Sequence, residues 1–411
     1  MDRIAIVGAG PAGFFTAQQL LRSCSNPIHI SIIEKKLTPF GLVRYGVAPD
    51  HPEVKNVIQK FTTTMNLPNI TYLGNVTVGS DITVSQLKEN FDAVIIASGS
   101  SSDRELGIPG ENSLNVLSGR DFVGWYNGDP DHCESKVKLD AGDTAIVLGQ
   151  GNVALDCARI LLAGPEVLEK TDISPYALQA LKSSTIKKVH VVGRRGLIQA
   201  SFTSKEVREM MALENVAFIT PDASILEQVD SNKAFLSQNR PKKRLMDIII
   251  KGSPKSLHEC EKTWQLDFLS TPTRIIQNKL GYVEAIEFEQ NELVNQDANE
   301  LNPIKAKARG TGSFFQKPCS LVIKCVGYQN NPVSGLPFDP KSSIIPSIRG
   351  RVLLDGEESP SSNVYVAGWI KTGPVGVLTS TLFDANETAF SVLEDLKKID
   401  SQTPEKLGIL L

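Results

Sequence analysis

The chain has 411 residues, a length typical of two or three domains. Hydrophobic residues make up 41% of the sequence. With the 31 glycines about half of the chain is apolar, which excludes a largely disordered protein. The formal net charge of −3 lacks the basic excess typical of general nucleic-acid binders, so we expect no nucleic-acid partner.

The N-terminal segment predicts a strand, a glycine turn, a helix and a second strand. A short continuous apolar run is typical of a parallel strand that is buried on both faces of its sheet. The elements follow in the order of a strand at 4–7, the turn Gly8-x-Gly10-x-x-Gly13, a helix over 14–21 and a strand at 28–33 that ends at Glu34.

This order indicates a dinucleotide site. The first glycine permits a tight turn, the second lets a pyrophosphate approach the backbone, and the third lets helix and strand pack closely. The phosphates would lie at a helix N-terminus, which favours anions. Glu34 stands where a carboxylate can accept hydrogen bonds from ribose hydroxyls. The alternative is a glycine-rich turn with a surface glutamate.

A second unit of the same kind begins near the middle of the chain, after a further strand at 93–97. It comprises a strand at 145–148, the turn Gly149-Gln-Gly151-Asn-Val-Ala154, a helix to about 162 and a strand at 189–192. Arg194 and Arg195 follow that strand in place of an acid. Two guanidinium groups suit a 2′-phosphate, so this unit predicts NADP rather than NAD. The alternative is two solvated arginines on a loop.

Two different sites imply two different dinucleotides. If the second site takes NADPH, the first most simply takes FAD, and hydride would pass from the nicotinamide to flavin N5. The six cysteines include no CxxC pair that could receive the electrons, and Cys319 and Cys325 are interpreted as two buried thiols, with a dithiol function as the alternative. We therefore expect the electrons to leave directly to an external acceptor.

The rest of the chain is less regular up to about residue 317. Antiparallel strands are expected at 245–250 and 283–289, apolar strands at 321–326 and 364–367, and a helix over 377–396. The most apolar long stretch, 145–164, is interrupted by polar residues, so no transmembrane segment is expected. No signal or transit segment is visible before Ile4.

Six motifs, taken together, resemble one family: the adrenodoxin reductase-type NADPH–ferredoxin reductases, including their mycobacterial relatives. The motifs are GAGPAGFFTAQQLL at 8–21, PFGLVRYGVAPDHPEVKNV at 39–57, GQGNVALDCARILL at 149–162, GRRG at 193–196, FTSKEVREM at 202–210 and VAGWIKTGPVGVL at 366–378. They occur in the family's order, and the second is far more specific than a glycine turn. Thr372 departs from the pattern, because the family usually has arginine there.

The resemblance implies an α/β fold with two Rossmann-like dinucleotide-binding domains, a glutathione-reductase-like FAD domain and an NADP domain inserted into it. The expected FAD domain comprises residues 1–103 and 326–411, and the NADP domain comprises residues 104–325. The implied activity is FAD-dependent NADPH:ferredoxin (adrenodoxin) oxidoreductase. Single electrons would pass to a 2Fe–2S ferredoxin that supplies hydroxylases or iron–sulfur cluster assembly.

Site residues follow from the same resemblance, position by position. Those expected to contact FAD, with the first glycine turn, are Gly8, Gly10, Ala12, Gly13, Glu34, Leu42, Val76, Trp369, Gly376, Val377 and Leu378. Those expected to contact NADP are Gln150, Gly151, Asn152, Val153, Arg194, Arg195, Glu206 and Gly376. No metal site is expected.

Two further hypotheses concern the flavin pocket. His51, with Glu209 added by the resemblance, could control proton movement near N5, and the alternative is that both only shape the pocket. Gly373-Pro-Val-Gly376 precedes a helix, and its N–H groups could stabilise negative charge on the reduced flavin. The alternative for this segment is a turn that leads into the helix.

The acceptor is expected to be a small acidic 2Fe–2S ferredoxin. Arg240-Pro-Lys-Lys-Arg244 carries four positive charges in five residues, and with Arg208 it could form a basic docking patch. Without the resemblance, a solvated loop would be the preferred interpretation. The resemblance also implies a monomer in the mitochondrial matrix.

Other classes stay open at this point. The chain could be another two-domain flavoprotein, such as an NADPH-dependent monooxygenase or the reductase subunit of a larger complex. A redox-inactive FAD-binding scaffold would tolerate a spoiled nicotinamide site, and the intact second glycine turn with Arg194 and Arg195 argues against that.

Overall fold

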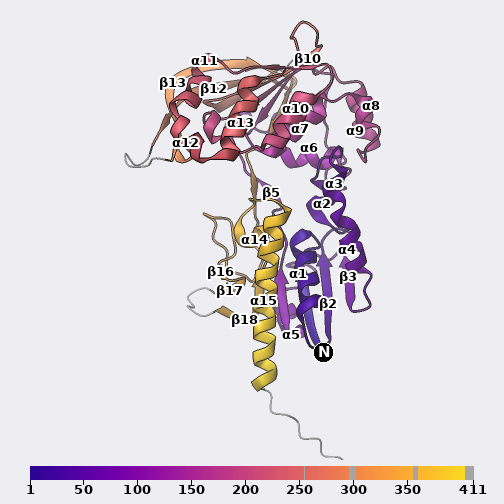
Figure 1. The fold of residues 1–411 in the computed structure, drawn as a ribbon. Coiled ribbons are helices and arrows are strands. Elements are labelled where there is room, and N and C mark those ends of the chain that lie inside the picture. Colours follow the sequence, from indigo (N-terminus) through magenta and orange to yellow (C-terminus); the bar gives the residue numbers. More distant parts are fainter. Residues whose placement is uncertain (254, 296–301, 355–359, 403–411) are drawn as a thin grey trace, which may run out of the picture. The chain divides into compact units, whose positions relative to one another are not determined.

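The structure is a computed structural model and describes residues 1–253, 255–295, 302–354 and 360–402. Its contacts divide the chain into two units (Figure 1). Unit 1 comprises Met1–Val47, His51–Ser102 and Tyr328–Leu411, and unit 2 comprises Ala48–Asp50 and Asp103–Gly327. The sequence did not predict that a short segment near residue 50 would be grouped with the second unit.

Unit 1 is built on a seven-stranded sheet whose central strands are parallel. The strands lie in the order β16 (Ser347–Ile348), β17 (Arg351–Leu353), β18 (Pro360–Val366), β4 (Ala93–Ile96), β1 (Asp2–Val7), β2 (Ile28–Glu34) and β3 (Ile70–Gly74). β4 thus lies between β1, from the start of the chain, and β18, from its last part. The predicted strands at 4–7, 28–33 and 93–97 are confirmed.

Apolar side chains cover both faces of this sheet, as the continuous apolar runs predict. The helices of unit 1 are α1 (Pro11–Ser23), α2 (Gly41–Tyr45), α3 (Pro52–Lys55), α4 (Val57–Met65), α5 (Val84–Asn90), α14 (Trp369–Thr372) and α15 (Leu378–Gln402). Figure 1 shows α15 beside α1, and Phe14 of α1 shares a core with Ala385 and Ala389 of α15. The predicted helix over 377–396 is confirmed as part of α15.

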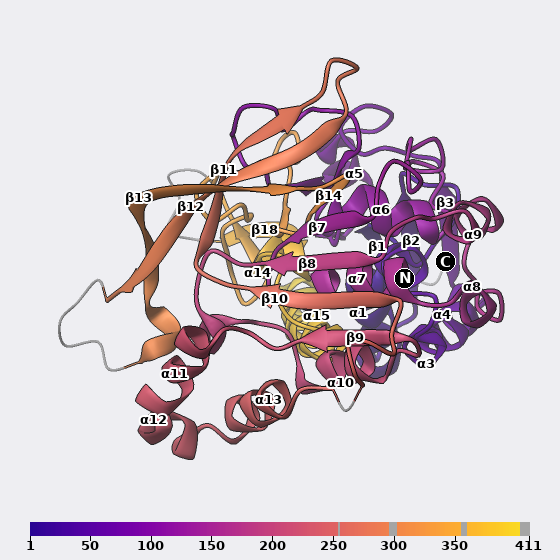
Figure 2. The ribbon, with the colours of Figure 1, turned by 90° about the horizontal axis from the view of Figure 1, so that it is seen from above.

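Unit 2 is built on a six-stranded parallel sheet, of which Figure 2 shows the central strands side by side. The order is β6 (Val116–Ser118), β14 (Leu321–Lys324), β7 (Thr144–Leu148), β8 (Lys188–Val192), β10 (Lys262–Asp267) and β9 (Val216–Ile219). An antiparallel sheet adds β11 (Ser270–Gln277), β12 (Val283–Val294) and β13 (Lys307–Pro318). At the residues where the chain passes from one unit to the other, β5 (Ser102–Asp103) and β15 (Tyr328–Gln329) form a two-stranded sheet.

The helical parts of unit 2 correct one prediction. They are α6 (Gly119–Tyr126), α7 (Asn152–Leu162), α8 (Pro165–Leu168), α9 (Pro175–Lys182), η1 (Leu197–Gln199), α10 (Ser204–Ala212), α11 (Ala223–Ser231), α12 (Lys233–Gln238), α13 (Arg240–Lys251) and η2 (Pro303–Lys305). Residues 245–250 belong to α13, so the expected strand is wrong. Asn239 accepts a hydrogen bond from Lys242 N–H, and Pro241 stands in the first turn, so this end has the features of a helix start.

The mixed α/β fold with parallel sheets agrees with the predicted pair of Rossmann-like units. Among the described residues, no helix is both long enough and apolar enough to cross a membrane.

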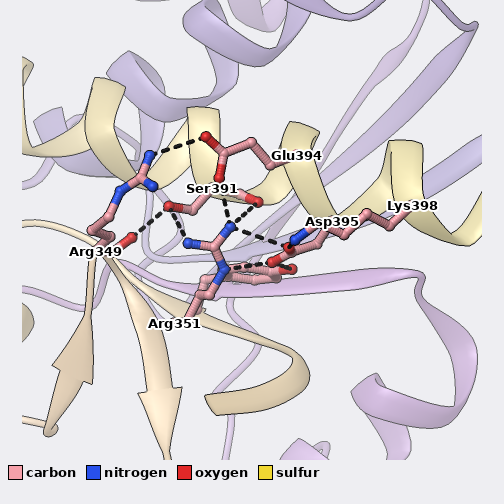
Figure 3. A network of polar contacts seen from close by, with 7 residues as sticks. Arg349, Arg351, Ser391, Glu394, Asp395 and Lys398 are labelled. Atoms are coloured by element: carbon pink, nitrogen blue, oxygen red, sulfur yellow. Dashed lines mark hydrogen bonds and ion pairs between the residues drawn. The ribbon is translucent and has the colours of Figure 1, made fainter. Parts of the chain in front are cut away.

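Arg351 fastens the hairpin of β16 and β17 to α15 (Figure 3). Its guanidinium contacts the Asp395 carboxylate at 2.6 and 3.1 Å, Ser391 Oγ at 3.0 Å and Glu394 at 2.9 Å. The Tyr365 hydroxyl donates to Asp395 at 3.0 Å. Burial alone would raise the pKa of Asp395, but the hydrogen bonds from Arg351 and Tyr365 outweigh it and lower this pKa.

Replacing Arg351 with alanine should lower the free energy of unfolding by about 3 kcal/mol, because it leaves the half-buried Asp395 carboxylate with only the exposed Lys398 as a cation, at 3.3 Å. Arg349 is the matched control, since its exposed guanidinium pairs only with Glu394 among the described residues, at 3.0 Å. Arg349→Ala should cost less than about 1 kcal/mol. Urea unfolding followed by circular dichroism measures both, and equal losses would contradict the assignment.

Candidate functional site

The first glycine turn is shaped by two close backbone contacts. Gly8 has φ = +112°, and a Cβ atom there would lie 2.3 Å from the Ala97 carbonyl oxygen. A Cβ atom on Gly13 would lie 2.1 Å from the Gly8 carbonyl oxygen. Both positions therefore require glycine, and α1 begins directly against the ends of the strands.

Gly10 differs from these two glycines because its Cβ position is open. The residue is extended, with φ −85° and ψ −174°, and is the N-cap of α1 without a side-chain hydrogen bond to that end. A Cβ atom on Gly10 would meet no atom within 4 Å. The start of α1 thus borders a space that the protein does not fill, as a dinucleotide pyrophosphate requires.

Glu34, at the end of β2, is held at the same turn. Its Oε2 accepts a hydrogen bond from Ala9 N–H at 2.8 Å, which leaves further lone pairs for ribose hydroxyls. Val76 N–H donates to the Glu34 carbonyl oxygen at 3.0 Å. Phe40 N–H donates to the Ala9 carbonyl oxygen at 2.8 Å, and Leu42 follows in α2. The predicted residues Glu34, Leu42 and Val76 therefore come together at one turn.

The C-terminal part of unit 1 reaches this turn as well. A Cβ atom on Gly368 would lie 2.5 Å from the Cβ of Ala12, so the start of α14 packs on the first turn of α1. Trp369 is the first residue of α14 and stacks on Tyr328 with ring centroids 5.7 Å apart. The structure thus brings Ala12 and Trp369, predicted from opposite ends of the chain, into one neighbourhood.

The loop before α15 has two of its N–H groups already engaged. Val375 N–H donates to the Gly373 carbonyl oxygen at 2.9 Å, and Val377 N–H donates to Ser380 Oγ at 3.0 Å. Residues 376–378 lead into the helix, and Gly376 has φ = +93°. The hypothesis that this loop directs its N–H groups at the flavin stays a prediction, and between Val375 and Val377 only Gly376 has an N–H group without a partner among the described residues.

The second glycine turn repeats the first. Gly149 has φ = +142°, and a Cβ atom there would lie 2.2 Å from the Cys325 carbonyl oxygen. Gly151 is the N-cap of α7 without a side-chain cap, and the nearest atom to its Cβ position is Ser201 Oγ at 3.6 Å. Ala154, in the third glycine position, is fully buried. The turn has the same open helix start as the first.

Two predicted NADP residues hold this turn in place. Gln150 Nε2 donates to carbonyl oxygens of β8 and β10 at 3.0 and 3.2 Å. Asn152 Oδ1 accepts from Thr203 N–H at 2.9 Å, which joins the start of α7 to the N-cap of α10. Val153 lies half-buried in the first turn of α7. The side chains of Gln150 and Asn152 therefore stabilise the turn through their hydrogen bonds to neighbouring segments.

Arg194 and Arg195 follow β8 on a loop whose backbone carbonyl oxygens accept hydrogen bonds. Asn291 Nδ2 donates to the Arg194 carbonyl oxygen at 2.8 Å, and Leu269 N–H donates to the Arg195 carbonyl oxygen at 3.1 Å. Arg195 is half-buried, and its Nη1 donates to the Ile304 carbonyl oxygen at 3.4 Å. Burial lowers the pKa of Arg195, and the charge of Arg194 lowers it further. Two cations placed in this way favour a phosphate dianion.

Arg159, on α7, is the centre of an ion-pair cluster that the sequence did not predict. Its side chain is 3% exposed and contacts Asp50 at 2.6 Å, Asp156 at 2.8 Å, Glu206 at 3.4 Å and Glu209 at 3.7 Å. Burial opposes the charge, but the hydrogen bond to Asp50 and the charge of Asp156 raise the pKa of Arg159 above its ordinary value. Glu206 and Glu209, expected from resemblance alone, thus share one buried cation.

His51 and Glu209 fall in different units. His51 belongs to unit 1, where it is the N-cap of α3 and is 9% exposed. Glu209 belongs to unit 2, on α10. Their pairing at a flavin pocket stays a prediction.

The predicted docking residues lie on two adjoining helices of unit 2. Arg208 on α10 and Arg240 and Arg244 on α13 are all exposed. Figure 2 shows the two helices side by side. The basic run therefore lies in the first turn of a helix and not on a loop, and its role in docking stays a prediction.

The expectation of two buried thiols holds for one of the two cysteines. Cys319 is buried as predicted, but Cys325 is only half-buried. The neighbour of Cys325 is Cys157 on α7, with the two sulfur atoms 3.8 Å apart. Burial raises the pKa of Cys157, which keeps its thiol protonated.

Asp267, at the end of β10, has a half-buried carboxylate, and its backbone carbonyl oxygen accepts the hydrogen bond from Gln150 of the second turn. His190 Nδ1 lies 2.8 Å and Lys317 Nζ 2.9 Å from Asp267 Oδ2. Burial would raise the pKa of Asp267, but His190 and Lys317 outweigh it and lower the pKa to about 2.

Asp267→Asn should therefore lower the free energy of unfolding by about 2 kcal/mol at neutral pH. Because the folded-state pKa is depressed, the stabilisation is complete above about pH 4 and is lost as the pH falls toward about 2. Urea unfolding, followed by the fluorescence of buried Trp264 on the same strand, measures the difference at each pH. A difference that does not change across this window would contradict the assignment.

Comparison with known proteins adds independent findings. The family model described as pyridine nucleotide-disulphide oxidoreductase matches residues 2–243. The mitochondrial NADPH:adrenodoxin oxidoreductase of Arabidopsis thaliana is 39% identical over 409 residues, covering 96% of this chain and 82% of the plant protein. The NADPH-ferredoxin reductase FprA of Mycobacterium leprae is 40% identical over 414 residues, covering 99% of this chain and 86% of that protein.

A solved structure gives the same result. Mycobacterium tuberculosis FprA in complex with NADPH superposes with a TM-score of 0.89 at 37% identity, covering 97% of this chain and 85% of that chain.

Proposed function

The chain belongs to the pyridine nucleotide-disulphide oxidoreductases and, within them, to the NADPH:adrenodoxin oxidoreductase family, and on this basis we propose that unit 1 binds FAD and unit 2 binds NADP(H). The protein is an oxidoreductase that uses NADPH and FAD to reduce a ferredoxin. One observation carries the assignment of the sites. Two glycine turns of the same shape are followed by opposite charges, Glu34 in one unit and Arg194 with Arg195 in the other.

The residues of unit 1 fit FAD. The open position at Gly10 leaves room for the pyrophosphate at the start of α1, and Glu34 is fixed where it can accept hydrogen bonds from ribose. Bound FAD supplies a hydride acceptor at N5 that can pass electrons on singly. The role of the protein is to hold and orient the FAD. Trp369 and residues 376–378 are proposed to close over it.

The residues of unit 2 fit NADP(H). The start of α7 offers N–H groups to the pyrophosphate, and Arg194 and Arg195 offer donors to the 2′-phosphate. Glu206, held by Arg159, is proposed to orient the nicotinamide end. Glu209, held by the same cation, and His51 are proposed to hold a proton near the site of hydride transfer.

Anaerobic mixing with NADPH tests the proposal. We expect NADPH to bleach the 450-nm absorption of bound flavin and NADH to do so far more slowly, because only NADPH engages the two arginines. Equal rates with both nucleotides would overturn the assignment of unit 2, and a preparation that retains no FAD would overturn that of unit 1.

The electron acceptor is proposed to be an acidic 2Fe–2S ferredoxin, which docks on Arg208, Arg240 and Arg244. Three exposed cations on adjoining helices steer a negatively charged partner, although the chain as a whole is slightly acidic. We also propose that the protein is a monomer and acts in the mitochondrial matrix. Its reduced partner would supply hydroxylases or iron–sulfur cluster assembly.

Reversing both charges in Arg240→Glu/Arg244→Glu should lower kcat/KM for a 2Fe–2S ferredoxin by about 10²-fold at low ionic strength. It should also weaken the salt dependence, while NADPH-driven reduction of free flavin is unchanged. Lys182→Glu/Lys188→Glu is the control, because it reverses two exposed cations elsewhere on unit 2. Equal loss of both activities would speak against docking.

A further inference from the structure

The basic run that opens α13 does not present its four charges on one face. Arg240, Lys243 and Arg244 are exposed, whereas Lys242 is half-buried. Lys242 precedes the buried Met246 by one helical turn, so it lies on the inward stripe of the helix. Its side chain therefore belongs to the interior of unit 2 rather than to the docking surface.

Lys242 reaches the loop that carries the two arginines. Its Nζ donates a hydrogen bond to the carbonyl oxygen of Ala200, the buried residue that follows η1. That loop begins with Arg194 and Arg195. Burial lowers the pKa of Lys242, and the charge of Arg195 lowers it further. Lys242 thus lies at the loop that follows the two arginines. The next residue of that loop, Ser201, lies beside the second glycine turn, with its Oγ 3.6 Å from the Cβ position of Gly151.

These three cations differ from four other buried or half-buried cations in the described part of the chain, which pair with carboxylates. Arg159, Lys324, Lys371 and Arg351 each pair with at least one carboxylate within hydrogen-bond distance. Arg194, Arg195 and Lys242 have no carboxylate partner anywhere in the part of the chain that the structure describes. Arg195 and Lys242 are both half-buried, so their like charges disfavour each other, and a dianion bound by them and by the exposed Arg194 would relieve that repulsion.

We propose that Lys242 is a third cation for the ribose 2′-phosphate and so determines the preference for NADPH over NADH. The inference rests on the proposed function, in which the second glycine turn binds NADP(H). The ligand class is a phosphomonoester dianion on ribose. Lys242 can keep its hydrogen bond to Ala200 and still offer two N–H donors, because an ammonium group has three.

The test is calorimetric titration of the FAD-loaded protein with 2′-AMP and with 5′-AMP. Lys242→Met keeps the length and apolar stem of the side chain and removes the charge. We expect it to weaken 2′-AMP binding by about 10-fold and to leave 5′-AMP binding unchanged. Lys243→Met, one residue further along and exposed, should change neither, and Lys242→Arg should restore most of the affinity for 2′-AMP.

The outcomes separate this inference from the proposed function. If the unmodified protein shows no preference for 2′-AMP over 5′-AMP, the assignment of NADP(H) to unit 2 is wrong. If it shows the preference and Lys242→Met retains it, unit 2 keeps its function and the role of Lys242 is wrong. A loss that is equal for both nucleotides, with a lower melting temperature, would identify Lys242 as a support for η1 only and would also overturn the inference.

Discussion

Replacing Gly10 with valine is expected to abolish the retention of FAD while leaving the apoprotein folded. The backbone of Gly10 is extended, so any residue can adopt its conformation. A Cβ atom would meet no atom within 4 Å, so the added side chain occupies the space proposed for the pyrophosphate rather than space within the protein. Losing two or more charge-assisted hydrogen bonds should weaken FAD binding by about 10³-fold.

Gly8 supplies the contrasting variant. Gly8→Ala places a Cβ atom 2.3 Å from the Ala97 carbonyl oxygen at a positive φ, so it should destabilise the apoprotein itself. The FAD content per chain, read from absorption, and urea unfolding of each apoprotein distinguish the two effects. Stoichiometric FAD in Gly10→Val would show that no phosphate approaches this turn.

Arg194→Ala/Arg195→Ala should lower kcat/KM for NADPH by about 10³-fold and change that for NADH by no more than a few-fold. Each arginine is proposed to make a charge-assisted contact with the 2′-phosphate, which NADH lacks. The fold should be little affected, because the loop keeps the hydrogen bonds from Asn291 and Leu269 to its carbonyl oxygens and loses only the 3.4 Å contact of Arg195 with Ile304.

Steady-state reduction of ferricyanide with each nucleotide measures the ratio without involving the protein partner. Arg309→Ala removes an exposed guanidinium that pairs with Glu292 on the antiparallel sheet, and it should leave both rates unchanged. A parallel fall with NADPH and NADH would mean that the arginines support the turn and do not select the nucleotide.

The parts that could be predicted from sequence are those in which the pattern is local. Each glycine turn lies within about 50 residues of the charged residues that follow the next strand, Glu34 in one unit and Arg194 in the other. The apolar strands beside each turn pair in a parallel sheet as expected. The strand predicted at 245–250 failed because Ile248, Ile249 and Ile250 suggest β structure. The buried residues there are Leu245, Met246 and Ile249, and Ile249 follows the other two by four and three positions, as on one face of a helix.

The parts that could not be predicted depend on contacts between distant residues. Arg159 and Asp50 are 109 positions apart, and Cys157 and Cys325 are 168 apart, so no spacing rule connects them. Lys242 lies two residues from Arg240, but Arg240 is exposed and Lys242 is half-buried. Which of the two would be covered depends on how α13 packs against the rest of unit 2. Resemblance supplied Glu206 and Glu209 but not the buried cation that holds them.

The place of β4 in its sheet has a consequence for how the protein is made. β4 has β1 on one side and β18 on the other, and β18 ends at Val366. During synthesis, the edge of β4 that pairs with β18 therefore stays unpaired until residues 103–327 have left the ribosome. Unpaired apolar strands invite aggregation. The second unit is thus complete before the first, and a chaperone that shields the edge of β4 would raise the yield of active protein more than one that acts on the inserted unit.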